Sequence, residues 1–137
     1  MPDFVKRNKG KILNVSSTAS LMAGPLQAVY YATKAYVTSF SNAIAEELYD
    51  TNITVTAVLP GATETEFAKT SGMDKTDLFS KTASPSVIAQ AGYDVMLKGK
   101  LNVIAGLTSM QKMMMISIPF MPKKMMLKQV RVMQEVK

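Results

Sequence analysis

Tyr30 and Lys34 are the two residues of this sequence whose types and spacing best suit proton transfer. Side chains four positions apart on a helix stack on the same face. An ammonium group beside a phenol favours the phenolate, and so lowers a tyrosine pKa from its ordinary value of about 10. A tyrosine altered in this way can act as a general acid or base near neutral pH. The pair therefore predicts a proton-transfer site on a helix.

Ser17 supports this interpretation, because it follows the apolar run 12–15 and would stand at the end of a strand. From that position its hydroxyl could hydrogen-bond the reacting oxygen of a carbonyl or alcohol. The sequence has no histidine and no cysteine, so the site would be built without them, and we expect no metal. A tyrosine and a lysine at this spacing are, by themselves, more often part of a solvated helix face. The strands predicted on both sides of the pair favour a proton-transfer site over a solvated helix face.

Two predicted strands and one helix must position these side chains. Within residues 11–16 the apolar residues Ile12, Leu13 and Val15 are nearly continuous, as in buried parallel strands, and residues 53–59 are rich in β-branched residues. Between them, residues 29–50 carry apolar side chains at helical period. A strand, a helix and a strand form a right-handed unit with parallel strands. Ser17 and Pro60 then lie at the carboxyl ends of the strands, where ligands bind in open α/β sheets.

Three segments together resemble the short-chain dehydrogenase/reductase family: NVSS at 14–17, YYATK at 30–34 and PGATET at 60–65. The resemblance implies an α/β fold. It would be a partial Rossmann-like, doubly wound parallel sheet, consisting of the last three strands and their helices, with a C-terminal helical tail. It also implies an oxidoreductase that transfers a hydride between NAD(P)H and a carbonyl or alcohol.

The same resemblance implies a role for each matched residue. Tyr30 would be the catalytic acid or base, Lys34 would favour its ionised form, and Ser17 would orient the substrate carbonyl. Tyr30 and Lys34 would also contact the cofactor, which would be NAD or NADP. The residues implied to line the nicotinamide are Pro60, Gly61, Thr63 and Thr65.

The remaining elements up to residue 106 complete this unit. Residues 63–81 have the length and polarity of a loop or lid. Ser84 and Pro85 begin another helix, and residues 101–105 form a third strand. The seven glycines form no cluster after a strand, so a phosphate-binding turn is missing. We therefore expect residues 1–106 to be the C-terminal half of the domain and the chain to be a fragment without the nucleotide-binding half.

Residues 107–137 differ in composition and are predicted to form two amphipathic helices, split by Pro119 and Pro122. They hold eight of the 12 methionines, with six Lys and Arg against one Glu. This tail could pack on the lid as core, which we favour, lie on an anionic membrane surface, or bind an acidic partner. Nucleic-acid binding is not expected, because aromatic residues are not interleaved with the basic ones.

Two functions of different classes remain open. The first is the oxidoreductase, acting on a small carbonyl or alcohol substrate that the apolar lid and tail suggest is hydrophobic. The second is a catalytically inactive truncated protein that acts as an interaction or membrane-surface module. A homo-oligomer formed through the 29–50 helix is expected by resemblance. The lack of cysteine fits a cytoplasmic location.

Overall fold

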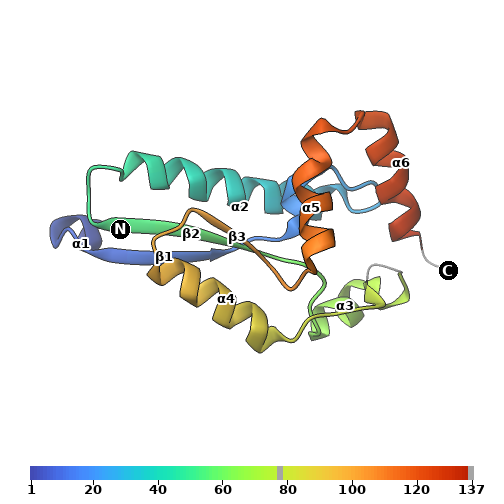
Figure 1. Ribbon diagram of the computed structural model, residues 1–137, viewed down its shortest axis with the longest axis horizontal. Coiled ribbons are helices and arrows are strands. Elements are labelled where there is room, and N and C mark those ends of the chain that lie inside the picture. Colours follow the sequence, from blue (N-terminus) through green and yellow to red (C-terminus); the bar gives the residue numbers. More distant parts are fainter. Residues whose placement is uncertain (77–78, 136–137) are drawn as a thin grey trace.

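A computed structural model describes residues 1–76 and 79–135 of the chain. Figure 1 shows a parallel sheet with helices on both faces and a helical hairpin at one end. The strands are β1 (Gly10–Val15), β2 (Ile53–Pro60) and β3 (Asn102–Ala105). The α-helices are α1 (Pro2–Lys6), α2 (Ala28–Glu47), α3 (Glu66–Ser71), α4 (Pro85–Leu97), α5 (Ser109–Ser117) and α6 (Lys123–Gln134). Short 3₁₀ helices are η1 (Thr18–Leu21), η2 (Met73–Lys75) and η4 (Ile118–Phe120).

The sheet has the order β1-β2-β3, with all neighbouring strands parallel. β2 lies in the middle, so its side chains are covered on both faces, and five of them in a row, Val55 to Leu59, are buried. This burial explains why the segment is an apolar run without alternation. The register places Val15 beside Val58 and Pro60 beside Ala105. The α/β fold predicted from the sequence is confirmed.

The two faces of the sheet are packed differently. On the α4 face, Val58, Ile88 and Ala105 form an apolar cluster. On the α2 face, the contact between helix and strand includes a polar pair. The buried Ser41 hydroxyl of α2 accepts a hydrogen bond of 2.9 Å from Asn14 Nδ2 of β1. The small residues of α2 thus let the helix lie close to β1.

The predicted helix 29–50 is three residues too long, because α2 ends at Glu47. Beyond it, the amide of Tyr49 bonds to the carbonyl of Glu46, and the amide of Thr51 to that of Leu48, both in tight turns. These bonds replace the helical pattern. The predicted strands are shifted by no more than one residue at their ends. The tail helices, predicted at about 109–118 and 122–136, agree within two residues with α5 and α6. Residues 77–78 of the predicted lid and the end of the tail, 136–137, lie outside the described residues.

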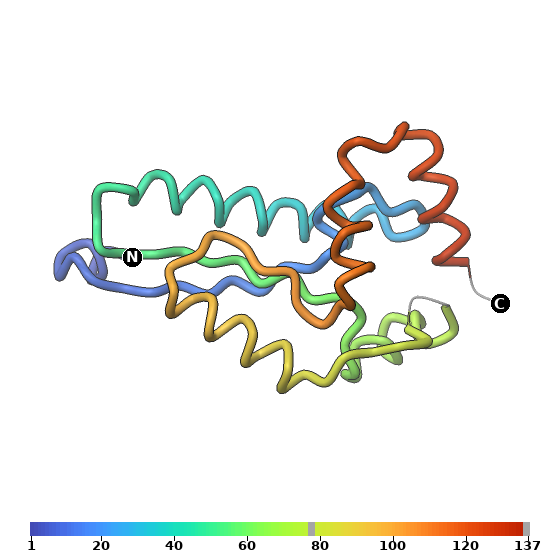
Figure 2. The backbone as a smooth tube through the Cα atoms, in the orientation of Figure 1, coloured from blue at the N-terminus to red at the C-terminus, as the bar shows by residue number. Residues whose placement is uncertain are grey.

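The tail packs back onto the start of α2. Val130 of α6 is buried against Ala19 of η1 and Tyr31 of α2. Figure 2 shows α6 beside the segment that leads into α2. None of the helices among residues 1–76 and 79–135 combines the length and apolarity that crossing a membrane requires.

Candidate active site

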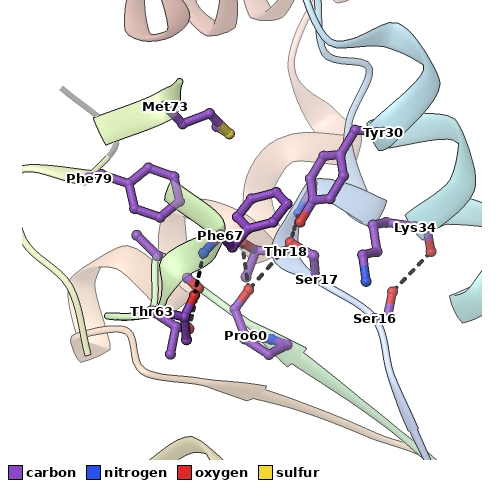
Figure 3. Close-up of a pocket in the computed structure, with 14 residues that line it drawn as sticks. Ser16, Ser17, Thr18, Tyr30, Lys34, Pro60, Thr63, Phe67, Met73 and Phe79 are labelled. Atoms are coloured by element: carbon purple, nitrogen blue, oxygen red, sulfur yellow. Dashed lines mark hydrogen bonds between the residues drawn. The ribbon is translucent and has the colours of Figure 1, made fainter. Parts of the chain in front are cut away.

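A cavity of about 230 Å³ lies at the carboxyl ends of β1 and β2, bounded by the first turns of α2 and by α3 (Figure 3). All seven residues that the sequence predicts for the site line it. They are Ser17, Tyr30, Lys34, Pro60, Gly61, Thr63 and Thr65. The parallel arrangement of β1 and β2 brings together residues that are more than forty positions apart. The catalytic and cofactor-binding roles of these residues remain predictions.

The two serines at the end of β1 have different environments. Ser16 is buried, its hydroxyl donates to the carbonyl of Lys34 at 2.9 Å, and it lies 2.6 Å from Thr38 Oγ1. The Ser17 hydroxyl instead accepts a hydrogen bond from the amide of Ala19 at 3.1 Å and lies 3.5 Å from the Pro60 carbonyl. Ser16 therefore connects β1 to α2. The hydrogen bond that Ser17 donates to the Pro60 carbonyl is long and weak, so the Ser17 hydroxyl can donate to a ligand oxygen instead.

Tyr30 and Lys34 extend from the first two turns of α2 into the same cavity (Figure 3). The Lys34 ammonium lies 5.8 Å from the centre of the Tyr30 ring. It also donates to the Val15 carbonyl at 3.4 Å, across the end of β1. The lysine is therefore held between the tyrosine and the strand, where it can contact both the phenol and a bound ligand.

Tyr31, the neighbour of Tyr30, points into the packed interior. Its hydroxyl accepts a hydrogen bond from Gln134 Nε2, and its ring lies edge-on to Tyr30 with 5.9 Å between the centres. A side chain at Gly24 would overlap the Tyr31 ring, so only glycine allows this close approach. Burial, together with the negative charge of an ionised Tyr30, raises the pKa of Tyr31 to about 12. Tyr31 is thus a packing residue that stays protonated at neutral pH.

The segment after β2 forms the opposite wall. The Pro60 carbonyl accepts a hydrogen bond from Thr18 Oγ1 at 3.2 Å, and the Gly61 carbonyl accepts one from Thr63 Oγ1 at 2.9 Å. A Cβ at Gly61 would overlap Cδ2 of Leu107, so a larger residue here would require the Leu107 side chain to move. The Thr65 hydroxyl accepts from the Phe67 amide at 3.4 Å and caps α3. These contacts hold the wall in a fixed shape.

Seven further residues line the cavity, and besides Ser16, Ala19 and Ala62 they include four whose side chains add to its walls. Three come from the lid: Phe67, Met73 and Phe79. Phe67 lies 5.3 Å from the Tyr30 ring and 6.5 Å from Phe79, measured between ring centres. The fourth is Thr18, one residue after the predicted serine. The two phenylalanines stand out in a loop that is otherwise polar, and this could have indicated their place in the cavity. Together with Met73 they make one side of the cavity apolar.

The donors and acceptors present fit the nicotinamide end of a dinucleotide. The Lys34 ammonium can donate to ribose hydroxyls, and Thr63 and Thr65 bring hydroxyls to the wall formed by Pro60 and Gly61. That wall consists of small residues, which favours the close approach of a planar ring. For the diphosphate end, the sequence offers no glycine cluster of the kind that cradles phosphates. The chain thus fits one end of such a cofactor.

Comparison with known families agrees with this geometry. Residues 1–76, more than half of the chain, match the family model of the short chain dehydrogenases. The mouse very-long-chain 3-oxoacyl-CoA reductase is 37% identical over 112 residues, covering 76% of this chain and 36% of that protein. The 3-oxoacyl-[acyl-carrier-protein] reductase of Synechocystis is 40% identical over 66 residues, covering 48% of this chain and 27% of that protein.

Solved structures share the fold. A 7beta-hydroxysteroid dehydrogenase superposes with a TM-score of 0.77 at 21% identity, covering 95% of this chain and 51% of that one. An actinorhodin polyketide ketoreductase with NADPH superposes with a TM-score of 0.64 at 28% identity, covering 77% and 50% of the two chains. The matched region thus covers 36% and 27% of the two curated relatives. It covers about half of each of the two solved structures.

Proposed function

The chain belongs to the short-chain dehydrogenase family, and from this premise we propose that it forms the catalytic part of an oxidoreductase acting on a carbonyl or alcohol. The observation that supports this most is the single cavity that Ser17, Tyr30 and Lys34 share at the ends of two parallel strands. The relatives are named as reductases, and the actinorhodin polyketide ketoreductase of similar fold was solved with NADPH, which supports a nicotinamide cofactor, NAD or NADP.

In the direction of reduction, the Tyr30 hydroxyl donates its proton to the carbonyl oxygen of the substrate, which becomes the alcohol. A nicotinamide, when bound, would supply the hydride that the carbonyl carbon receives. Ser17 donates a hydrogen bond to the same oxygen and fixes its position. Lys34 stabilises the phenolate that Tyr30 becomes, because its ammonium group lies beside the ring. In the reverse direction the phenolate accepts the alcohol proton.

We further propose a hydrophobic substrate, because Phe67, Met73 and Phe79 form an apolar side of the cavity. The 3-oxoacyl reductases among the relatives make a 3-oxoacyl thioester the first compound to test. The proposal includes a nucleotide-binding half supplied from outside residues 1–137, a cytoplasmic location, and self-association through α2.

The activity is tested on the protein as its own cell produces it. The purified protein is incubated with a 3-oxoacyl thioester and with NADPH or NADH that carries deuterium at the transferable position. The proposal predicts an alcohol product that has gained one deuterium. A product without deuterium, or no product with either cofactor and a panel of ketones, would contradict it and would favour the inactive interaction module.

A further inference from the structure

The hairpin formed by α5 and α6 has an inner face that is already occupied. Ile118 and Val130 are buried, and α6 contacts the cluster around Tyr31. Between the helices lies a narrow apolar cavity of about 60 Å³. Six methionines line it: Met22, Met114, Met115, Met121, Met126 and Met133. The inner side chains therefore pack within the protein, and any further partner must contact the outer face or the tip.

The tip and the outer face of α5 expose large apolar side chains. Phe120, in the turn between the helices, is 87% exposed. Met110, Met113 and Ile116 follow at intervals of three residues along α5, so they share one side of the helix, and all three are largely exposed. Figures 1 and 2 show that this turn lies at the end of the hairpin that is farther from the sheet. Phe120, in this turn, thus lies far from the candidate active site.

Basic residues lie close in sequence to the exposed ring of Phe120. Met121 and Pro122 separate Phe120 from Lys123 and Lys124, which begin α6, and Lys112 and Lys128 lie on the two helices. The one acidic residue of 107–137, Glu135, pairs with Arg131 at 3.2 Å and lies at the opposite end of α6 from the tip. The tip therefore combines an exposed aromatic ring with lysines whose charge no acidic residue of the hairpin offsets.

We propose that this tip docks on an anionic membrane surface, with Phe120 inserted among the lipid headgroups and Lys123 and Lys124 against the lipid phosphates. Interfacial binding of this kind needs apolar side chains beside basic ones, and its strength depends on both. A protein partner fits less well, because lysine is depleted at protein interfaces. The proposal does not depend on catalysis, since no residue of the candidate site is involved.

The first experiment uses the full chain, which has no tryptophan, so that Phe120→Trp introduces a single fluorescent reporter. Vesicles of phosphatidylcholine with phosphatidylserine should shift its emission to the blue, and bromine-labelled lipid should quench it. The matched control is Tyr49→Trp, because Tyr49 is 80% exposed in the turn after α2. It should show neither effect. An unchanged emission from Phe120→Trp, or equal changes in both variants, would overturn the proposal.

The second experiment separates charge from insertion by vesicle sedimentation. Lys123→Ala with Lys124→Ala should weaken binding to the mixed vesicles about 25-fold, at about fivefold for each lysine near the surface. Phe120→Ser should also weaken binding, while its exposed position leaves the melting temperature unchanged. The control pair is Lys98→Ala with Lys100→Ala at the end of α4, which should bind as the unaltered chain does. Equal binding to phosphatidylcholine alone, or a Phe120→Trp shift that appears with protein concentration and without vesicles, would overturn the proposal.

Discussion

Ser16 and Ser17 are adjacent in sequence, but their hydroxyls have different tasks. The Ser16 hydroxyl is bonded to the first turns of α2, which carry Tyr30 and Lys34. The Ser17 hydroxyl lines the cavity, and among the described residues it donates only over a long contact of 3.5 Å, to the Pro60 carbonyl. Substitution of each serine should therefore change a different property of the protein.

We predict that Ser16→Ala lowers the free energy of unfolding by about 1–3 kcal/mol, because it leaves buried polar groups without their partner. Ser17→Ala should cost less, at most about 1 kcal/mol for the lost cap bond to the Ala19 amide. It should lower kcat by roughly 10²-fold, since it removes a hydrogen bond to the reacting oxygen. Urea unfolding and steady-state kinetics on both variants provide the test. Similar losses of stability in both would show that the serines are equivalent.

At the scale of the elements, the hydrogen bond from Gln134 to Tyr31 joins residues 103 positions apart. It attaches the end of α6 to the helix that carries Tyr30. Burial and the ionised form of the adjacent Tyr30 raise the pKa of Tyr31 to about 12 in the folded chain, against about 10 in the unfolded chain. This difference makes the stability of the contact dependent on pH.

The sign follows from linkage: a raised folded pKa means that the unfolded chain releases the proton first. The contribution is fully present below about pH 10 and is lost as pH rises towards about 12. We predict that Tyr31→Phe loses less stability over this interval than the unaltered chain does. Urea unfolding at several pH values measures it, with Tyr49→Phe as the exposed control. Parallel curves for Tyr31→Phe and the unaltered chain would refute the assignment.

The start of α5 offers a simpler test of an element. Thr108 Oγ1 accepts from the Gln111 amide at 3.3 Å, and the Gln111 side chain accepts from the Thr108 amide at 2.9 Å, forming a capping box. Thr108→Ala should cost about 1 kcal/mol of stability. The exposed Thr70 of α3 provides the control substitution, Thr70→Ala. If both changes lower the urea midpoint equally, the cap has no special role.

At the scale of the whole molecule, α2 leaves two aromatic rings uncovered. Tyr36 and Phe40 stack with 5.8 Å between their centres and remain substantially exposed. We propose that they form the contact between copies of the chain. Tyr36→Ser with Phe40→Ser should raise the dissociation constant at least tenfold in analytical ultracentrifugation, because an aromatic pair buries much apolar surface. Tyr49→Ser is the control, and a monomer before substitution would contradict the proposal.

Much of this architecture could be predicted from local patterns. The β-branched run of β2 and the helical period of α2 define a parallel unit, and parallel strands bring Ser17 and Pro60 to one edge. Contacts that join distant segments could not be predicted. The sequence around Gln134 does not indicate that its side chain contacts Tyr31. Methionines can pack against many partners, so the sequence of α6 does not indicate where the helix packs. The lid residues Phe67 and Met73 were missed for the same reason.

The measurement that tests the central claim most directly is the turnover of the protein from its own cell with Tyr30→Phe introduced in its gene. Removal of the hydroxyl that exchanges the proton should lower kcat/KM for carbonyl reduction by roughly 10²–10⁴-fold. Tyr36→Phe, on the exposed side of the same helix, should leave it unchanged. Carbonyl reduction that survives Tyr30→Phe at an undiminished rate would show that the cavity around this tyrosine is not the catalytic site.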